Sequence, residues 1–132
     1  MNFGILGEAK IAREHVVPAI LNAGHKVTHV GRRIPGQVGL PEIYGNAIET
    51  DYETLINEPS VDAIYNPLPN HLHVPYSIEA LKADKHVLCE KPVALNLDEL
   101  SQLENAAKDS KAFFYEAFMV RSHPQWHWLK NL

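Results

Sequence analysis

The fold is decided by one stretch near the N-terminus, Phe3-Gly4-Ile5-Leu6-Gly7-Glu8-Ala9-Lys10-Ile11-Ala12. Its apolar first half is typical of a buried strand, and the small residues that follow lead into a helix. Gly7 can adopt the tight turn, and Ala12 is small enough to let the helix pack closely on the strand. The amide groups of the first helical turn then face any anion that docks there. The stretch therefore predicts a strand, a turn and a helix that together can bind a phosphate.

Two features of this turn weaken the prediction when the segment is taken alone. Ala9 stands where the dinucleotide-binding fingerprint prefers a second glycine, so its methyl group lies where a pyrophosphate would approach the backbone. Glu8 repels an incoming phosphate, and Lys10 offsets that repulsion. A turn that only packs a helix against a strand is the alternative that this segment leaves open.

The composition is that of an ordinary folded protein with one domain. The chain has 132 residues, of which 45% are hydrophobic and 21% charged, with a formal net charge of -4. The basic residues are dispersed, which argues against a nucleic-acid surface or a polybasic membrane patch and favours small solutes as partners. Cys89 is the only cysteine, so a disulfide framework is excluded and a reducing compartment fits. With neither a signal-peptide pattern nor a long apolar run, the sequence predicts a cytoplasmic protein.

The rest of the chain alternates between strands and helices, which predicts an α/β fold with a doubly wound parallel sheet of the Rossmann type. Strands are expected near residues 2–6, 25–30, 46–48, 61–66, 86–89 and 112–117. The helix after the first strand is expected to break or kink at Pro18 and to stop at Gly24. One side of that helix carries Ile11, Val16, Ala19, Ile20 and Ala23.

Capping boxes predict the starts of two later helices. Thr50 with Glu53 predicts a brief helix through Ile56, and Asn96 with Glu99 predicts a longer one. The longer helix is expected to bury a stripe that consists of Leu97, Leu100, Leu103 and Ala107. Between residues 34 and 45, prolines and glycines leave little room for the crossover helix of a regular doubly wound sheet.

The end of the second strand bears on the choice of cofactor. A fold that binds NAD usually places Asp or Glu here to hold the ribose 2′-hydroxyl, whereas arginine favours the 2′-phosphate of NADP. This stretch contains no acid and two arginines, Arg32 and Arg33. A guanidinium can donate two parallel hydrogen bonds to a phosphate and can also stack on adenine. Arg32 is therefore the first candidate for binding the 2′-phosphate, and Arg33 is the second. A solvated basic turn is the alternative.

A polar loop follows the fourth predicted strand, Asn66-Pro67-Leu68-Pro69-Asn70-His71-Leu72-His73, and leads into a helix that runs to about Ala83. Asn70 is predicted first as the N-cap of this helix, ahead of a direct contact with a ligand. His71 and His73 do not share a helix face at this spacing, so the pair does not predict a metal site.

The turn Glu90-Lys91-Pro92 follows the apolar strand 86–89. Open parallel sheets bind ligands beyond the carboxyl ends of their strands, which is where this turn is expected. Lys91 is then placed to meet a hydroxyl or carbonyl oxygen of a substrate. An ordinary surface turn is the alternative, and the isomer of the Lys91–Pro92 bond is left open by the sequence.

Three of these segments together resemble the Gfo/Idh/MocA family, the group of glucose-fructose oxidoreductase and inositol dehydrogenase. They are residues 4–12, 69–73 and 90–92, and the run 118–125 looks closest to the branch of sugar and dihydrodiol dehydrogenases. The resemblance covers nearly the whole chain apart from residues 34–45. It implies a Rossmann domain for NAD or NADP at residues 1–119, and at residues 120–132 the start of a connection to a C-terminal substrate domain outside this chain.

The resemblance also implies roles for individual residues. Gly7, Ala9 and Ala12 would form the pyrophosphate turn, Arg32 would recognise the adenosine end, and Lys91 would be the catalytic residue that contacts the substrate oxygen and helps to orient the nicotinamide ring. The loop of Pro69, Asn70 and His73 would line the nicotinamide half. The implied cofactor-binding set is Gly7, Glu8, Ala9, Lys10, Ile11, Ala12, Arg32, Arg33, Pro69, Asn70, His73, Glu90 and Lys91, and no metal is expected.

The implied reaction is hydride transfer between C4 of the nicotinamide and a hydroxyl-bearing carbon of a sugar or cyclic diol. As a cation, Lys91 would stabilise negative charge that develops on the substrate oxygen. Family members usually handle the proton with an Asp and His pair in the substrate domain, so this chain alone is expected to bind the cofactor but to be catalytically incomplete. NADP is the expected cofactor and NAD the alternative.

Two other hypotheses remain open at this point: a dinucleotide-binding module without catalysis, and a truncated gene product. The partners expected are a small-molecule substrate and either further copies of the chain or a substrate domain. Exposed aromatic rings at Trp126 and Trp128 would suit such a contact.

Overall fold

A six-stranded parallel sheet forms the centre of the computed structural model, which describes residues 1–132. Along the sheet the strands are ordered β3-β2-β1-β4-β5-β6. The chain moves outward from β1 through β2 to β3, then crosses back to place β4 on the other side of β1, as in the Rossmann fold. The predicted fold class is confirmed. The strands are β1 (Asn2–Leu6), β2 (Lys26–Gly31), β3 (Ile48–Thr50), β4 (Ala63–Asn66), β5 (His86–Cys89) and β6 (Phe114–Glu116).

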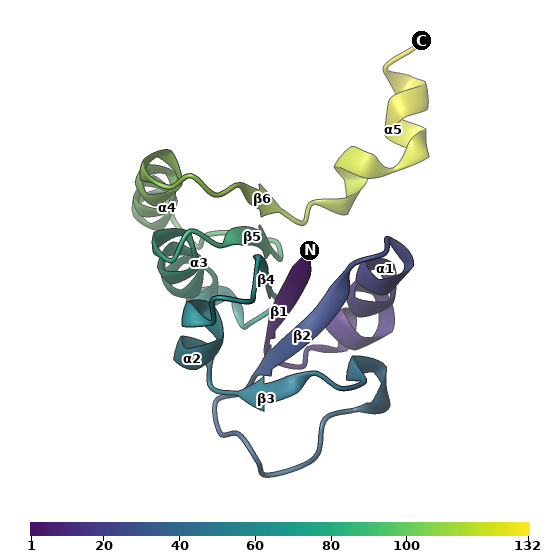
Figure 1. The fold of residues 1–132 in the computed structure, drawn as a ribbon. Helices are drawn as coiled ribbons and strands as arrows, with labels where there is room; N and C mark the ends of the chain where they lie inside the picture. The colour runs from purple at the N-terminus through teal and green to yellow at the C-terminus, as the bar shows by residue number, and fades with distance from the viewer.

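Helices cover both faces of this sheet (Figure 1). One face carries a π-helical segment, η1 (Ala12–Val16), continued by α1 (Val17–Asn22). The other face carries α2 (Tyr52–Asn57), α3 (His73–Lys82) and α4 (Leu97–Asp109). Short 3-10 turns occupy η2 (Glu42–Tyr44), η3 (Asn70–Leu72) and η4 (Met119–Ser122), and the last helix is α5 (Pro124–Leu129).

Two hydrophobic clusters lie one on each side of the sheet. Successive residues of a strand point to opposite faces: Leu6 and Ile64 pack toward α2 and α3, whereas Ile5 and Tyr65 pack toward η1 and α1. All four are fully buried. Strands that are covered on both faces are apolar at successive positions rather than alternating with polar ones. This explains why most residues of β1 and β4 are apolar.

The helix after β1 changes character close to Pro18. The π-helical segment ends at Val16, and Pro18 lies in the first turn of α1. A proline is tolerated there because the amide it lacks belongs to the start of the helix. The backbone stays helical through Val16 and Val17, so the predicted break is not seen and only the helix type changes. The predicted stop at Gly24 is confirmed, and its φ of 79° lies in the left-handed region.

One predicted helix start and one residue of the predicted buried stripe are corrected. The N-cap of α2 is Asp51, whose Oδ1 accepts a hydrogen bond from the Thr54 amide at 2.8 Å. Thr50 remains in β3 because its carbonyl oxygen accepts from the Arg32 amide at 2.8 Å. The Asn96 cap of α4 is confirmed by the 2.9 Å bond from the Glu99 amide. Leu97, expected in the buried stripe, is 78% exposed because it lies in the first turn of α4, beyond the packed part of the helix.

The connection from β2 to β3 contains no crossover α-helix, as predicted, and only the 3-10 turn η2 interrupts it. Tyr44 from this turn is buried in the cluster on the α1 side. The third strand begins at Ile48 rather than at residue 46, because its pairing with β2 starts at His29 and Ile48.

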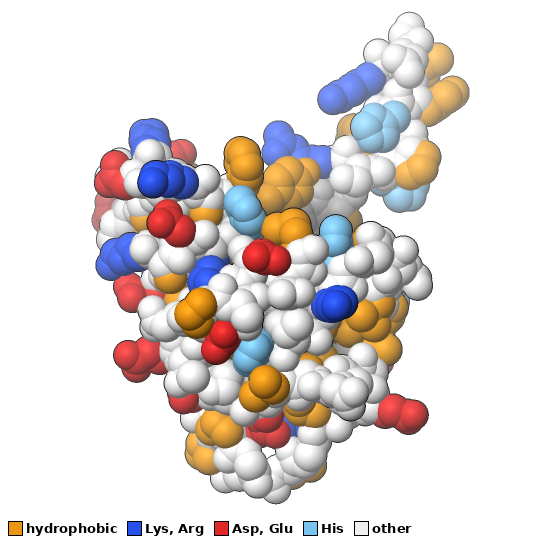
Figure 2. All heavy atoms as spheres, viewed as in Figure 1, with side chains coloured by type: hydrophobic (Ala, Val, Ile, Leu, Met, Phe, Trp, Pro, Cys, Tyr) orange, Lys and Arg blue, Asp and Glu red, His pale blue; other side chains and the backbone are white.

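The C-terminal segment leaves the sheet after β6. The helix expected near its end is present as α5, which projects away from the domain (Figure 1). Every residue from Phe118 onward is exposed. Figure 2 shows hydrophobic side chains on the surface around β6 and this segment. None of the helices is both long enough and apolar enough to cross a bilayer.

An apolar hollow of about 860 Å³ separates α1 from this C-terminal segment. It is lined on one side by the residues predicted to share a helix face, including Ala19 and Ala23, and on the other by Tyr115 and Phe118. The prediction of a common side is therefore confirmed, but that side is only partly buried.

Candidate functional site

The carboxyl ends of the strands meet along one rim of the sheet. Leu6 pairs with Gly31, Gly31 with Thr50, and Cys89 with both Asn66 and Glu116. The three predicted site segments, 7–12, 67–73 and 90–92, all begin at this rim. From β1 the chain first adds β2 and β3 on one side and then adds β4, β5 and β6 on the other. Parallel sheets of this kind bind ligands at the point where the strand order reverses, and that point lies on this rim between β1 and β4.

The turn after β1 requires glycine for two reasons. Gly7 has a φ of 80°, a conformation that costs other residues about 1–2 kcal/mol. A Cβ at this position would also lie 3.1 Å from Cδ2 of Leu68. The Gly7 amide donates to the Gly31 carbonyl at 2.8 Å, which ties the turn to the end of β2. The turn is thus held against both neighbouring strand ends.

The helix that follows this turn starts as the sequence predicts. Ala12 is fully buried, so its small side chain permits close packing on the sheet. The Ala9 carbonyl accepts from the Arg13 amide at 3.2 Å, so the amides before Arg13 belong to the first turn, where backbone donors lack partners within the helix. Lys10 is exposed and lies 3.9 Å from Glu14, an ion pair of little energetic weight.

Arg32 lies at the end of β2 and is held by two carboxylates. It forms ion pairs with Glu8 of the turn and with Glu49 of β3, the latter at 3.1 Å. Its guanidinium also donates to the carbonyl oxygens of Val38 and Gly39. Burial alone lowers the pKa of Arg32, but hydrogen bonds to Glu8 and Glu49 raise it above its ordinary value. Arg33 is exposed.

Glu49 is a residue of the candidate site that sequence reasoning missed. The local sequence at the end of β2 contains no acid, but the neighbouring strand supplies one, because Glu49 pairs with Val30 in the sheet. Its Oε1 accepts from the Gly36 amide at 2.7 Å and so fixes the loop after β2. The stretch at the end of β2 itself contains no acid, as stated from the sequence, but carboxylates from two other segments, Glu8 and Glu49, reach its Arg32. Glu49 could have been found from the register between β2 and β3. The third strand is too short for its sequence to predict that register.

A shallow hollow of about 290 Å³ connects the turn to the arginines. Two polar atoms near it are buried without a hydrogen-bond partner, Nε of Arg32 and the hydroxyl of Tyr44. Burial and the nearby Glu8 carboxylate raise the pKa of Tyr44 to about 12, so its hydroxyl is neutral. The hollow is lined by Glu8, Arg32, Arg33, Ile34, Gln37 and Val38.

His73 connects the two turns on the other side of β1. Its Nδ1 lies 2.8 Å from the Pro92 carbonyl oxygen, and its Nε2 lies 2.7 Å from that of Leu68. The residue is only 1% exposed, so the expectation that its side chain lines the cofactor is corrected: the ring lies beneath the loop. His73 therefore sets the positions of the Leu68 and Pro92 backbones.

Asn66 supports the same loop from the end of β4. Its Nδ2 donates to the His73 carbonyl at 3.1 Å and to Ser77 Oγ at 3.2 Å, and its Oδ1 accepts from the Leu68 amide at 3.3 Å. Asn70, predicted as an N-cap, makes no capping hydrogen bond: it begins η3, and α3 begins three residues later. Because the chain turns through η3 first, the side chains of Pro69 and Asn70 are left exposed at the rim.

The turn after β5 presents Lys91 to solvent. The Lys91–Pro92 bond is cis, which answers the question that the sequence left open. Glu90 accepts a hydrogen bond from the Tyr65 hydroxyl at 2.7 Å, and burial together with this bond raises the pKa of Tyr65. Lys91 takes part in none of the ion pairs of the structure, which involve Lys10, Arg32 and Lys82. Its ammonium group is thus free to meet a ligand.

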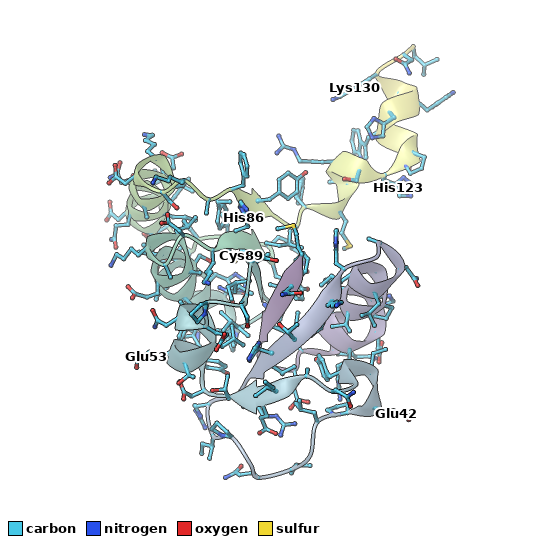
Figure 3. The ribbon with its side chains drawn as sticks, in the orientation of Figure 1. Glu42, Glu53, His86, Cys89, His123 and Lys130 are labelled. Atoms are coloured by element: carbon cyan, nitrogen blue, oxygen red, sulfur yellow. The ribbon has the colours of Figure 1, made fainter.

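Two other reactive side chains do not contribute to this rim. Burial raises the pKa of the Cys89 thiol to about 12, so the thiol stays protonated and is a poor nucleophile. His123 lies on the projecting C-terminal segment, apart from Cys89 and the strand ends (Figure 3), where it caps α5. No cluster of three or more potential metal ligands occurs in the structure.

The strand order and the glycine turn at the switch point define a Rossmann domain of the nucleotide-binding class. Residues 1–118 match the oxidoreductase family with an NAD-binding Rossmann fold, GFO_IDH_MocA. The chain belongs to this family, as the resemblance of its motifs predicted.

Relatives within the family act on sugars or diols according to their names. D-xylose 1-dehydrogenase (NADP(+)) 2 of Haloferax volcanii is 37% identical over 94% of this chain and 39% of its own length. Trans-1,2-dihydrobenzene-1,2-diol dehydrogenase of Danio rerio is 35% identical over 86% of this chain and 31% of its own length. The expected branch of sugar and dihydrodiol dehydrogenases is thus represented among the relatives.

A solved structure has the same fold over nearly the whole chain. The crystal structure of KijD10, a 3-ketoreductase from Actinomadura kijaniata in complex with TDP-benzene and NADP, matches 99% of this chain with a TM-score of 0.90 and 31% identity. The match covers 42% of the KijD10 chain. The present chain therefore spans about two fifths, or less, of the length of these relatives.

Proposed function

We propose that this chain is the cofactor-binding part of an NAD(P)-dependent oxidoreductase that transfers a hydride between the nicotinamide and a hydroxyl-bearing carbon of a sugar or cyclic diol. The observation that carries the proposal is the presence of the Gly7 turn and the Lys91 turn at one rim, on the two strands that flank β4. The relatives named as a xylose dehydrogenase, a dihydrobenzenediol dehydrogenase and a 3-ketoreductase support the class of substrate.

The proposed cofactor lies across the rim from the hollow near Arg32 to the turn of Lys91. The pyrophosphate would lie at the Gly7 turn, against the amides that precede Arg13, with Ala9 at the point of closest approach. NADP is proposed, because the strand end carries Arg32 and because two relatives are named with NADP. NAD is the alternative.

Lys91 is proposed as the residue that meets the substrate oxygen. When bound, the nicotinamide supplies or accepts the hydride. Lys91 would bind the oxygen through its ammonium group and stabilise the negative charge that grows there during transfer. The buried bonds of His73 to Leu68 and Pro92 would hold the neighbouring backbone at a fixed position. Pro69 and Asn70, exposed on the adjoining loop, would line the nicotinamide half.

The remaining proposals concern organisation. Residues 1–119 would form the Rossmann domain, and residues 120–132 would begin the connection to a substrate domain that provides the proton-transfer groups. The exposed apolar hollow beside α1 would suit contact with such a domain or with another copy of the chain. The cytoplasm is the proposed compartment, in keeping with the free thiol of Cys89.

Isothermal titration of this chain with NADPH and NADH tests the proposal. Saturable binding of one cofactor molecule per chain is expected, and it should be competed by adenosine nucleotides. A chain that is folded by circular dichroism but binds neither dinucleotide would contradict the proposal.

The proposal that Lys91 lies at the nicotinamide end of the bound cofactor is tested with one ligand that contains the nicotinamide and one that lacks it. Lys91→Ala is expected to weaken NADPH binding about threefold to tenfold, the loss of one charged contact of about 0.7–1.4 kcal/mol. It should leave the affinity for adenosine 2′,5′-bisphosphate unchanged. Lys82→Ala, at an exposed lysine of α3, is the matched control and should alter neither affinity. Equal losses for both ligands in Lys91→Ala would contradict the assignment to the nicotinamide end.

A further inference from the structure

We infer that Glu8 is a specificity-determining residue that lowers the affinity of the site for NADP relative to NAD by occupying the guanidinium of Arg32. The inference rests on the proposed function, because it assumes that the rim binds a dinucleotide. It concerns only the adenosine end, where the added phosphate of NADP is the single chemical difference between the two cofactors.

Both terminal nitrogens of the Arg32 guanidinium already have partners. Nη2 pairs with Glu8 and lies 3.5 Å from the Gly39 carbonyl oxygen, while Nη1 pairs with Glu49 at 3.1 Å and with the Val38 carbonyl. The Nε atom is buried and has no partner. The side chain is only 13% exposed. A 2′-phosphate therefore finds no free pair of donors on this arginine unless one of its present partners leaves.

The two carboxylates differ in how firmly they are held. Glu49 belongs to β3 and also accepts from the Gly36 amide at 2.7 Å, so its removal would release the loop after β2. Glu8 belongs to the turn, its side chain is 22% exposed, and its only ion pair is with Arg32. Glu8 is thus the partner that a phosphate displaces, whereas Glu49 is the anchor that keeps Arg32 in place.

The Glu8 carboxylate weakens the attraction that the arginines exert on a phosphate. Glu8 and Glu49 together carry two negative charges against the one positive charge of Arg32, and Arg33 adds a second positive charge at the exposed edge. A phosphate monoester brings about -1.5 to -2 charges and so meets repulsion from Glu8. A ribose 2′-hydroxyl can instead donate to a carboxylate. Glu8 therefore acts in opposite directions on the two cofactors.

The substitution Glu8→Gln removes the negative charge while keeping the size of the side chain and one acceptor oxygen. Titrations with adenosine 2′,5′-bisphosphate and adenosine 5′-monophosphate isolate the 2′-phosphate, and NADP and NAD report on the whole cofactor. We expect the variant to bind the bisphosphate and NADP about tenfold more tightly, while its affinity for the monophosphate and NAD stays the same or falls. The double substitution Glu8→Gln with Arg32→Gln should abolish the gain.

Glu14→Gln is the matched control, because it changes the net charge equally at an exposed residue of the next turn. It should shift the preference less than about twofold. The inference is overturned if Glu8→Gln changes the ratio of affinities less than twofold, or if Glu14→Gln changes it equally. Absence of binding of either dinucleotide to the unaltered chain would overturn the proposed function as well. Binding of both with an unchanged ratio in Glu8→Gln would overturn this inference alone.

Discussion

The rim proposed to bind the dinucleotide has an adenosine end near Arg32 and a nicotinamide end near Lys91, and the two are held by different kinds of interaction. At the adenosine end, ion pairs join Glu8, Arg32 and Glu49, and all three side chains remain partly exposed. At the nicotinamide end, the His73 ring lies between two backbone carbonyl oxygens and Asn66 forms hydrogen bonds to the same loop, and both residues are buried. The first end is built from charges at the surface and the second from polar groups in the interior.

This difference indicates which end can change without loss of the fold. Glu8 is the more exposed of the two carboxylates and its only ion pair is with Arg32, so it can be replaced while Glu49 still holds Arg32. Buried hydrogen-bonding groups are costly to leave without a partner, so substitutions there affect the whole domain. Cofactor preference can therefore be altered at the adenosine end, whereas the place of Lys91 is fixed by the structure beneath it.

The largest effect is expected for His73→Ala. The substitution removes both contacts of the ring and leaves the carbonyl oxygens of Leu68 and Pro92 without this partner in a buried place. Together with the cavity, this should lower the free energy of unfolding by about 2–4 kcal/mol, measured by urea denaturation. His71→Ala, at an exposed neighbour, should change it by less than about 0.5 kcal/mol.

Two further substitutions sharpen the result for His73. The amide nitrogen of His73→Asn can replace Nδ1 toward Pro92, and that of His73→Gln can replace Nε2 toward Leu68. Each is expected to recover part of the stability. Lys91→Ala is then added to each His73 variant. It should weaken NADPH binding only in a variant that preserves the contact with Pro92. Full stability in His73→Ala would show that the nicotinamide end is no more rigid than the other.

An intermediate effect is expected for Gly7→Ala, at the turn between the two ends. The positive φ alone costs about 1–2 kcal/mol, and the new Cβ would press on Leu68 at 3.1 Å. Gly24→Ala is a matched control, since its φ is 79° but no atom lies within 4 Å of a Cβ there. The excess destabilisation of Gly7→Ala over Gly24→Ala measures the contact with Leu68.

The same pair of variants distinguishes strain from function. Gly7→Ala should also weaken dinucleotide binding. Gly24→Ala should not, because Gly24 precedes β2 and lies at the amino ends of the strands, away from the rim. Equal destabilisation by the two substitutions would mean that the turn does not depend on its contact with the Leu68 loop.

The smallest effect is expected for the pH dependence of the free energy of unfolding that arises at the helix N-caps. One of these caps is a charged side chain and the other is neutral. Hydrogen bonds from Thr54 lower the pKa of Asp51 at the start of α2, whereas α4 begins with the uncharged Asn96. Because the folded pKa is the lower one, the stabilisation is complete above the unfolded pKa of about 3.9 and is lost as the pH falls through the folded value.

Urea unfolding of the unaltered chain and of Asp51→Asn between about pH 6 and pH 2.5 measures this contribution. The stability of Asp51→Asn should fall less steeply in the acid range. Parallel curves for the two proteins would show that the Asp51 carboxylate does not couple to folding.

The fold could be predicted from the sequence because its strands are buried on both faces and are separated by strong turn residues. The β5 bounds, the Asn96 cap and the missing crossover helix all followed from local patterns. The predictions that failed depended on contacts between distant segments. Thr50 stays in β3 because it pairs with β2, and Asn70 caps nothing because the chain first turns through η3.

The candidate site was predicted in outline for the same reason. The parallel arrangement brings the Gly7, Arg32 and Lys91 segments to one rim, as their positions after strands implied. Local sequence could not reveal that Glu49 reaches Arg32 from a neighbouring strand, which depends on register. Nor could it reveal that the His73 ring turns inward, which depends on the packing of α3 against the loop after β5.

Gly7, Leu68, His73 and Pro92 form an unbroken series of neighbours from the first turn to the peptide bond beside Lys91. Residues in direct contact share relaxation, so the energetic effects of substituting them do not sum. Any redesign of this domain for another substrate must therefore treat these four positions as one unit and choose their side chains together.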